Sequence, residues 1–136
     1  MTMTERPTPL RDADTTPFWN GVDQHTLLLQ HCYSCSAVVF YPRLACPACG
    51  GMTLEWFEAS GSGIVYSFTV VHRAAPGFED AVPYAVALVD LAEGARMMTR
   101  IIDASPADLR VGAAVEVSFV SADGDVVLPY FRLARK

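Results

Sequence analysis

The sequence predicts a mainly β chain: a short N-terminal helical segment, a cysteine-bearing ribbon, and a five-stranded barrel. Three observations support this prediction. Two C-x-x-C pairs stand ten residues apart, apolar residues alternate with period two after Gly63, and turn signals recur from there at intervals of roughly 8–12 residues. The 136 residues are 51% hydrophobic and 18% charged. This is enough apolar material for a packed core of one domain, or of a small module joined to a small domain.

Residues 1–29 are predicted to form a polar, proline-bearing lead followed by a short helix. Thr16 is the expected helix cap, and Pro17 stands in the first turn, where proline is well tolerated. Phe18 and Trp19 follow directly and are bulky enough to anchor the segment on the rest of the molecule.

Residues 30–59 are predicted to form the ribbon. A short strand over Leu27–Leu29 leads into its first cysteine turn. Its four cysteines are Cys32, Cys35, Cys46 and Cys49. Each C-x-x-C pair forms a tight turn that directs two sulfurs at one metal ion, and the stretch between the pairs brings the turns face to face. Short strands are expected over Val38–Tyr41 and Leu54–Phe57, and Gly50 and Gly51 permit a sharp exit from the second turn.

Four thiolates suit a tetrahedral Zn²⁺ ion, which is borderline soft and has no geometric preference of its own. Two alternatives exist: iron in the same four-sulfur site, and two disulfides, which the cytosol disfavours. A metal held by four sulfurs has no position left for water, so we expect a structural zinc ion. No thiol then remains for covalent catalysis.

Residues 60–136 are predicted to form the barrel, after a boundary at Ser60–Gly63. The expected strands cover Ile64–Arg73, Tyr84–Leu91, Ala95–Ile102, Ala114–Val120 and Val126–Leu133. In the first strand, one face is expected to hold Ile64, Tyr66, Phe68, Val70 and His72. A helical turn is expected over Ser105–Leu109, and a hairpin turn at Asp123–Gly124. Five strands in about 70 residues are typical of an OB-fold.

Charge and hydropathy argue against nucleic acid and membranes as partners. The net charge is −5 and Lys136 is the sole lysine, so we do not expect nucleic-acid binding, which depends on neutralising phosphates. No apolar run approaches the roughly 18 residues of a membrane span. The first residues lack the apolar stretch of a secretory signal, so we expect a cytoplasmic protein.

The order of motifs resembles the DUF35 family, in which a rubredoxin-like zinc ribbon is joined to an OB-fold. The resemblance covers about Pro17–Leu133. It is carried by F-W-N-G, the double C-x-x-C ribbon, G-I-V-Y-S-F-T-V-V-H-R, P-Y-A-V-A-L-V-D-L, M-M-T-R-I-I-D and D-L-R-V-G-A-A-V-E-V-S-F.

This resemblance implies a chain that assists an acyl-CoA enzyme. The family's usual companion is a thiolase-like or lipid-transfer-protein-like subunit that carries the catalytic residues, for example a steroid side-chain aldolase. We therefore expect a non-catalytic accessory subunit that supports its partner's assembly, substrate tunnel or activity. No catalytic role is expected for the histidines, which are His25, His31 and His72.

A few side chains are candidates for contact with the partner or with acyl-CoA. Arg96 and Arg100 stand four apart on a strand and so share one face, and Arg73 is a further cation near a strand end. Phe78 lies in a polar loop, either as an exposed anchor or folded back on the barrel. Alternative functions are a free-standing acyl-CoA-binding OB-fold module and, less favoured, a single-strand nucleic-acid binder.

Overall fold

The computed structural model describes residues 8–122 and 126–134 and confirms a mainly β chain with one short α-helix. Its elements are α1 (Thr16–Asp23), β1 (Leu28–Cys32), β2 (Val38–Val39), β3 (Leu54–Glu58), β4 (Ser62–Val71), β5 (Tyr84–Leu91), β6 (Arg96–Ile102), the 3-10 helix η1 (Pro106–Asp108), β7 (Ala114–Ser121) and β8 (Val127–Leu133). The hairpin turn predicted at Asp123–Gly124 lies outside the described residues. Within the described ranges, no helix has both the length and the apolar character needed to cross a membrane.

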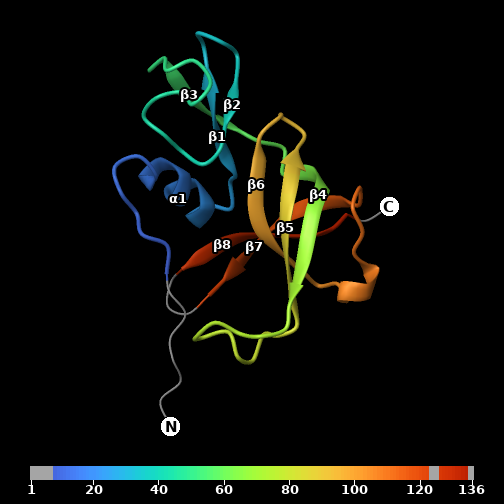
Figure 1. Ribbon diagram of the computed structural model, residues 1–136. Coiled ribbons are helices and arrows are strands. Elements are labelled where there is room, and N and C mark those ends of the chain that lie inside the picture. The colour runs from blue at the N-terminus through green and yellow to red at the C-terminus, as the bar shows by residue number, and fades with distance from the viewer. Residues whose placement is uncertain (1–7, 123–125, 135–136) are drawn as a thin grey trace.

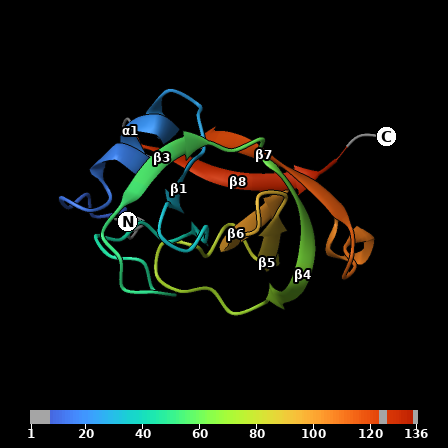
Figure 2. The same cartoon turned by 90° about the horizontal axis from the view of Figure 1, so that it is seen from above.

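The strands form two sheets. An antiparallel sheet has the order β2–β1–β3, and a closed barrel has the order β4–β5–β6–β8–β7, which confirms the predicted OB-fold. In the barrel, β6 and β8 pair in parallel and the other neighbours are antiparallel. The three-stranded sheet and α1 lie to one side of the barrel, and the orange turn that contains η1 lies on the other (Figures 1 and 2).

One hydrophobic core joins these parts. Helix α1 buries Phe18, Trp19 and Val22, and these side chains belong to the same cluster as the barrel interior. Other members of that cluster include Leu27, Leu29, Val65, Val89, Val115 and Phe131. Burying one large apolar side chain contributes about 1.5–3 kcal/mol. Helix α1 therefore holds the ribbon sheet and the barrel together through shared packing.

The start of α1 differs from the prediction by one residue. Thr15, and not Thr16, is the N-cap residue, and its side chain makes no capping hydrogen bond. The turn before the helix is instead organised by Asp12, whose Oδ1 accepts hydrogen bonds from the N–H groups of Asp14 and Thr15 at 3.1 and 2.9 Å. The Thr16 hydroxyl donates to the Asp12 carbonyl at 2.6 Å. An aspartate-centred turn thus replaces the threonine cap.

Strand β4 departs from strict alternation, so the predicted face is wrong. The pairing with β5 shifts at a bulge beyond Val65, and Tyr66 has no partner there. A single extra residue exchanges the two faces of a strand. Before the bulge, Val65 is buried and Ile64 is 53% exposed. Tyr66 in the bulge is 49% exposed, and Phe68 beyond it packs on the core, so Ile64 and Phe68 do not share a face. The strand also ends at Val71, before the predicted end at Arg73.

Gly63 tests this packing. A Cβ atom at Gly63 would lie 2.5 Å from Val89 Cγ1 and 2.9 Å from the Asp90 carbonyl oxygen. We expect Gly63→Ala to lower the free energy of unfolding by about 1–3 kcal/mol, because overpacking forces backbone and side chains apart. Urea unfolding would measure this, with the exposed neighbour Ser62→Ala as control. Equal stability of the two variants would contradict the packing described.

Candidate metal centre

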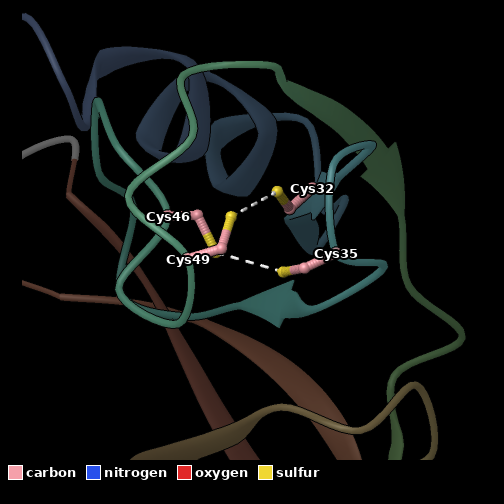
Figure 3. A group of neighbouring side chains, drawn as sticks. All are labelled: Cys32, Cys35, Cys46 and Cys49. Carbon is pink, nitrogen blue, oxygen red and sulfur yellow. Dashed lines mark hydrogen bonds between the residues drawn. The ribbon is translucent and has the colours of Figure 1, made fainter.

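The four cysteine sulfurs converge on one point. Cys32 and Cys35 lie at the turn between β1 and β2, and Cys46 and Cys49 lie in the loop before β3 (Figure 3). All four ligand atoms lie within 4.8 Å of one another. The Cys32–Cys49 sulfurs are 3.7 Å apart and the Cys35–Cys46 sulfurs are 3.6 Å apart.

These distances fit a tetrahedral metal site. With a zinc–sulfur bond of about 2.3 Å, the edge of a regular tetrahedron of sulfurs is about 3.8 Å. A disulfide bond needs about 2.0 Å, and all four cysteines are free thiols. The disulfide interpretation is therefore wrong, and the donor set fits one ion.

The two cysteine turns repeat one backbone geometry. In the first, the Ser36 N–H donates to the Cys32 carbonyl at 2.8 Å, and in the second the Gly50 N–H donates to the Cys46 carbonyl at 2.8 Å. The residue after each pair is left-handed, with φ of +66° at Ser36 and +77° at Gly50. Gly50 adopts this conformation without steric cost, as predicted, whereas Ser36 adopts it as a non-glycine residue. Each turn thereby presents two sulfurs on the same side.

Backbone N–H groups also donate hydrogen bonds to the sulfurs of the second pair. The N–H groups of Ala48 and Gly51 donate to the Sγ atoms of Cys46 and Cys49 at 3.4 and 3.3 Å. These bonds orient the two sulfurs.

The thiol pKa values of the first pair are pushed apart. Hydrogen bonding from the backbone of Cys35, followed by that of Ser34, lowers the pKa of Cys32 to about 7 against the effect of desolvation. The backbone bond from Ala37 lowers the pKa of Cys35, but desolvation and the three neighbouring sulfurs outweigh it and raise the value to about 12. Four thiolates this close repel one another. A divalent cation among them removes that repulsion.

The loop that carries the second pair is fixed by a buried amide. Gln30 on β1 is 4% exposed. Its Nε2 donates to the Arg43 carbonyl at 2.9 Å, and its Oε1 accepts from the Arg43 N–H at 2.8 Å. A buried side chain satisfied on both sides pins the loop, because breaking either bond leaves a buried polar group unpaired. Cys46 is thus held close to β1.

The structure does not bring the side chains predicted to contact a partner or acyl-CoA together in one site. Arg96 and Arg100 alternate with the buried side chains of β6, so both lie on its outer face. The Arg96 guanidinium is engaged by Asp90 at 2.5 Å and lies 3.5 Å from the Tyr66 ring centroid. The hydrogen bond that Arg96 donates to the Asp90 carboxylate raises the Arg96 pKa. This cation is already neutralised by the chain itself.

Arg100 has different surroundings, which the sequence did not reveal. Its guanidinium lies 5.0 Å from the Tyr84 ring centroid and 5.6 Å from that of Tyr130. The ring of Phe78 stands 5.9 Å from that of Tyr84, so Phe78 packs on the barrel. Arg73 is exposed in the loop that follows β4. Arg100 and Tyr130 also line a cavity of about 370 Å³.

A second, apolar cavity was not predicted from the sequence. It measures about 330 Å³ and lies between α1, the segment after β2, and strands β6 and β8. Its aromatic wall consists of Phe18, Trp19, Phe40, Tyr41 and Tyr130. The sequence shows that the chain is rich in aromatic residues. It does not show that these distant segments come together around one cavity.

The histidines form no reactive group among the described residues. His25 stacks on Phe119 with ring centroids 5.2 Å apart, and His31 meets Tyr33 edge-on at 4.8 Å. His72 is exposed beyond the end of β4. In the part of the chain that the structure describes, the four cysteines form the one cluster of three or more potential metal-ligating side chains.

Comparisons with known proteins agree with this architecture. Residues 19–55 match the family described as the ChsH2 rubredoxin-like zinc ribbon domain, and residues 56–120 match the ChsH2 C-terminal OB-fold domain. A DUF35 domain-containing scaffold protein of Methanocaldococcus jannaschii is 38% identical over 120 residues, which covers 85% of each chain. The chain belongs to the DUF35 family.

Other members of DUF35 extend the comparison. A protein of Thermomonospora curvata named as a probable enoyl-CoA hydratase alpha subunit is 36% identical over 130 residues, or 95% of this chain. This chain covers 40% of that longer relative. A chain of the solved structure described as "Ltp2-ChsH2(DUF35) aldolase" is 35% identical, with a TM-score of 0.82 and coverage of 92% of this chain and 98% of that one.

The metal of this DUF35 chain follows from the family and the geometry together. The chain carries a zinc ribbon whose four cysteines are close enough to bind one metal ion. Four sulfurs complete a tetrahedral shell, so such a site serves folding and offers no position for water.

Replacing one sulfur tests the centre. We expect Cys46→Ser to lose zinc and to unfold at least the ribbon, because structural zinc binding is coupled to folding. Metal analysis by mass spectrometry and thermal unfolding would measure both effects. Ala45→Ser, an exposed neighbour that gains the same hydroxyl, is the control. Full zinc content and unchanged stability in Cys46→Ser would contradict the assignment.

Acidification tests the thiolate character. A lowered pKa means that the Cys32 thiolate is favoured above that pKa and lost as the pH falls through it. Protons then compete with the metal, so we expect zinc release on lowering the pH from neutral, followed with a chromophoric zinc indicator. Release on raising the pH instead would speak against four thiolate ligands.

Proposed function

We propose that this DUF35 chain is a non-catalytic, zinc-binding accessory subunit of a thiolase-fold acyl-CoA enzyme, such as a thiolase or a steroid side-chain aldolase. Its zinc ligands are Cys32, Cys35, Cys46 and Cys49. The observation that carries the proposal is the solved relative at a TM-score of 0.82, which is described as part of an aldolase whose name joins Ltp2 to the DUF35 chain.

The chemistry of the described residues supports an assisting role. A nucleophilic thiol must be free and activated by a neighbouring base, whereas all four cysteines of this chain lie in the metal cluster. His25 and His31 contact aromatic rings and not a carboxylate or hydroxyl partner of the kind that a catalytic base needs. The acyl-CoA chemistry is therefore assigned to a partner subunit.

The outer face of β4, β5 and β6 is the surface we assign to that partner. Ile64, Tyr66 and Met98 are 53%, 49% and 65% exposed there. Strand pairing sets Ile64 opposite Asp90, and Asp90 opposite Arg96, so the apolar side chains adjoin an ion pair. An apolar patch with a polar border is the usual anatomy of a protein–protein interface.

Complex formation tests the proposal. We expect the zinc-loaded chain to co-purify with a thiolase-like protein of its native host and to raise that protein's activity on acyl-CoA. Size-exclusion chromatography with light scattering and a thioester assay would measure both. A chain that stays alone and leaves the enzyme unaffected would refute the proposal, as would thioester turnover by the isolated chain.

The docking face is tested by a charge. Met98→Asp is expected to abolish co-purification, because it places an unpaired carboxylate in a desolvated interface. Val111→Asp is a matched control, since Val111 is also 65% exposed but lies in the turn before β7. Unchanged zinc content would show that both variants fold. Equal loss or equal retention of the complex in the two variants would argue against this face.

A further inference from the structure

Arg100 carries a charge that the described chain does not neutralise. Its side chain is half-buried, and its Nε atom is buried without a hydrogen-bond partner. The ion pairs of the described residues use other arginines, namely Arg11, Arg96 and Arg132. A buried donor without a partner is costly, so such a group is retained where a ligand completes it or where packing overrides the cost.

The surroundings of Arg100 favour a ligand. The ring centroids of Tyr84 and Tyr130 lie 5.0 and 5.6 Å from the guanidinium carbon of Arg100. Such contacts involve the faces of the planar guanidinium group. The N–H donors lie in the plane of the guanidinium group and not over its faces, so these ring contacts do not use them. The adjoining cavity of about 370 Å³ also has exposed Pro83 and Asp103 in its wall, so it opens to solvent. Sites for small ligands commonly have this size.

We propose that this cavity is an oxyanion-binding site in which the Arg100 fork receives a phosphate or carboxylate group of a small molecule. Guanidinium matches both groups through two parallel charge-assisted hydrogen bonds. The cavity is larger than one carboxylate side chain would fill, which favours a small ligand over an acidic residue of another protein. The site goes beyond the accessory role, because the chain alone forms it.

Two neighbours set the properties of this site. Asp103 lines the same cavity and forms no ion pair with Arg100, so its carboxylate repels an anion and weakens binding. Arg96 stands four residues before Arg100 on the same strand face but is paired with Asp90. Arg100 is therefore the residue to test, and Arg96 on the same strand is its internal control.

The experiment is a titration of the zinc-loaded, ¹⁵N-labelled full chain with inorganic pyrophosphate and, separately, with malonate. The Nε–Hε resonance of Arg100, identified by its absence in Arg100→Lys, is the readout in the native chain. The backbone amide resonances of Ile102 and Ala104, which line the same cavity, report the affinity of every variant. We expect a saturable shift of these resonances in the native chain. Arg100→Ala is expected to weaken the affinity roughly tenfold or more. Arg96→Ala is expected to leave it unchanged, and Asp103→Asn to strengthen it.

The outcomes distinguish a phosphate ligand from a carboxylate ligand, and they distinguish a loss of binding from a loss of folding. A shift with pyrophosphate assigns a phosphate ligand and a shift with malonate assigns a carboxylate, and either supports the site. No shift with either anion overturns the proposal, as does an affinity that Arg100→Lys and Arg100→Ala leave intact. The amide spectrum shows whether each variant is folded. No partner enzyme is present, so the result is independent of complex formation.

Discussion

The ribbon depends on the convergence of four sulfurs on one ion. Its sheet has only three short strands, and β2 consists of two residues, so strand pairing alone stabilises it little. The long loop between the cysteine pairs carries no regular structure beyond β2. Four thiolates repel one another until a cation joins them, and that ion then ties the β1–β2 turn to the loop before β3. The apolar core of the ribbon is small, so metal binding supplies the rest of the free energy that stabilises its fold.

The core transmits this local order to the barrel. Phe18, Trp19 and Val22 on α1 belong to one cluster with Leu29 on β1 and with the barrel interior. Trp19 also donates its indole N–H to the Tyr41 hydroxyl at 3.3 Å. The ribbon is thus a fixed extension of the barrel surface, and not a module on a loose linker. A rigid surface of this kind loses little conformational freedom on binding, which suits the accessory role proposed for this chain.

The sequence predicts what local patterns encode. The C-x-x-C spacing predicts the metal centre, and alternation with turn signals predicts the five barrel strands, because both depend on residues close along the chain. The bulge at Tyr66 is not visible in the pattern, since alternating apolar residues fit either face until the pairing is known. The surroundings of Arg100 also escape prediction. Tyr130 reaches it only because β6 and β8 pair in parallel across a long separation in sequence.

The central claim is that four sulfurs close the coordination shell of a zinc ion and so leave acyl-CoA chemistry to another subunit. X-ray absorption at the zinc edge of the purified chain tests it most directly. The account predicts four sulfur neighbours at about 2.3 Å and no lighter atom in the shell. An oxygen or nitrogen neighbour at about 2.0–2.2 Å would contradict it, because a replaceable ligand would give this chain a reactive metal of its own.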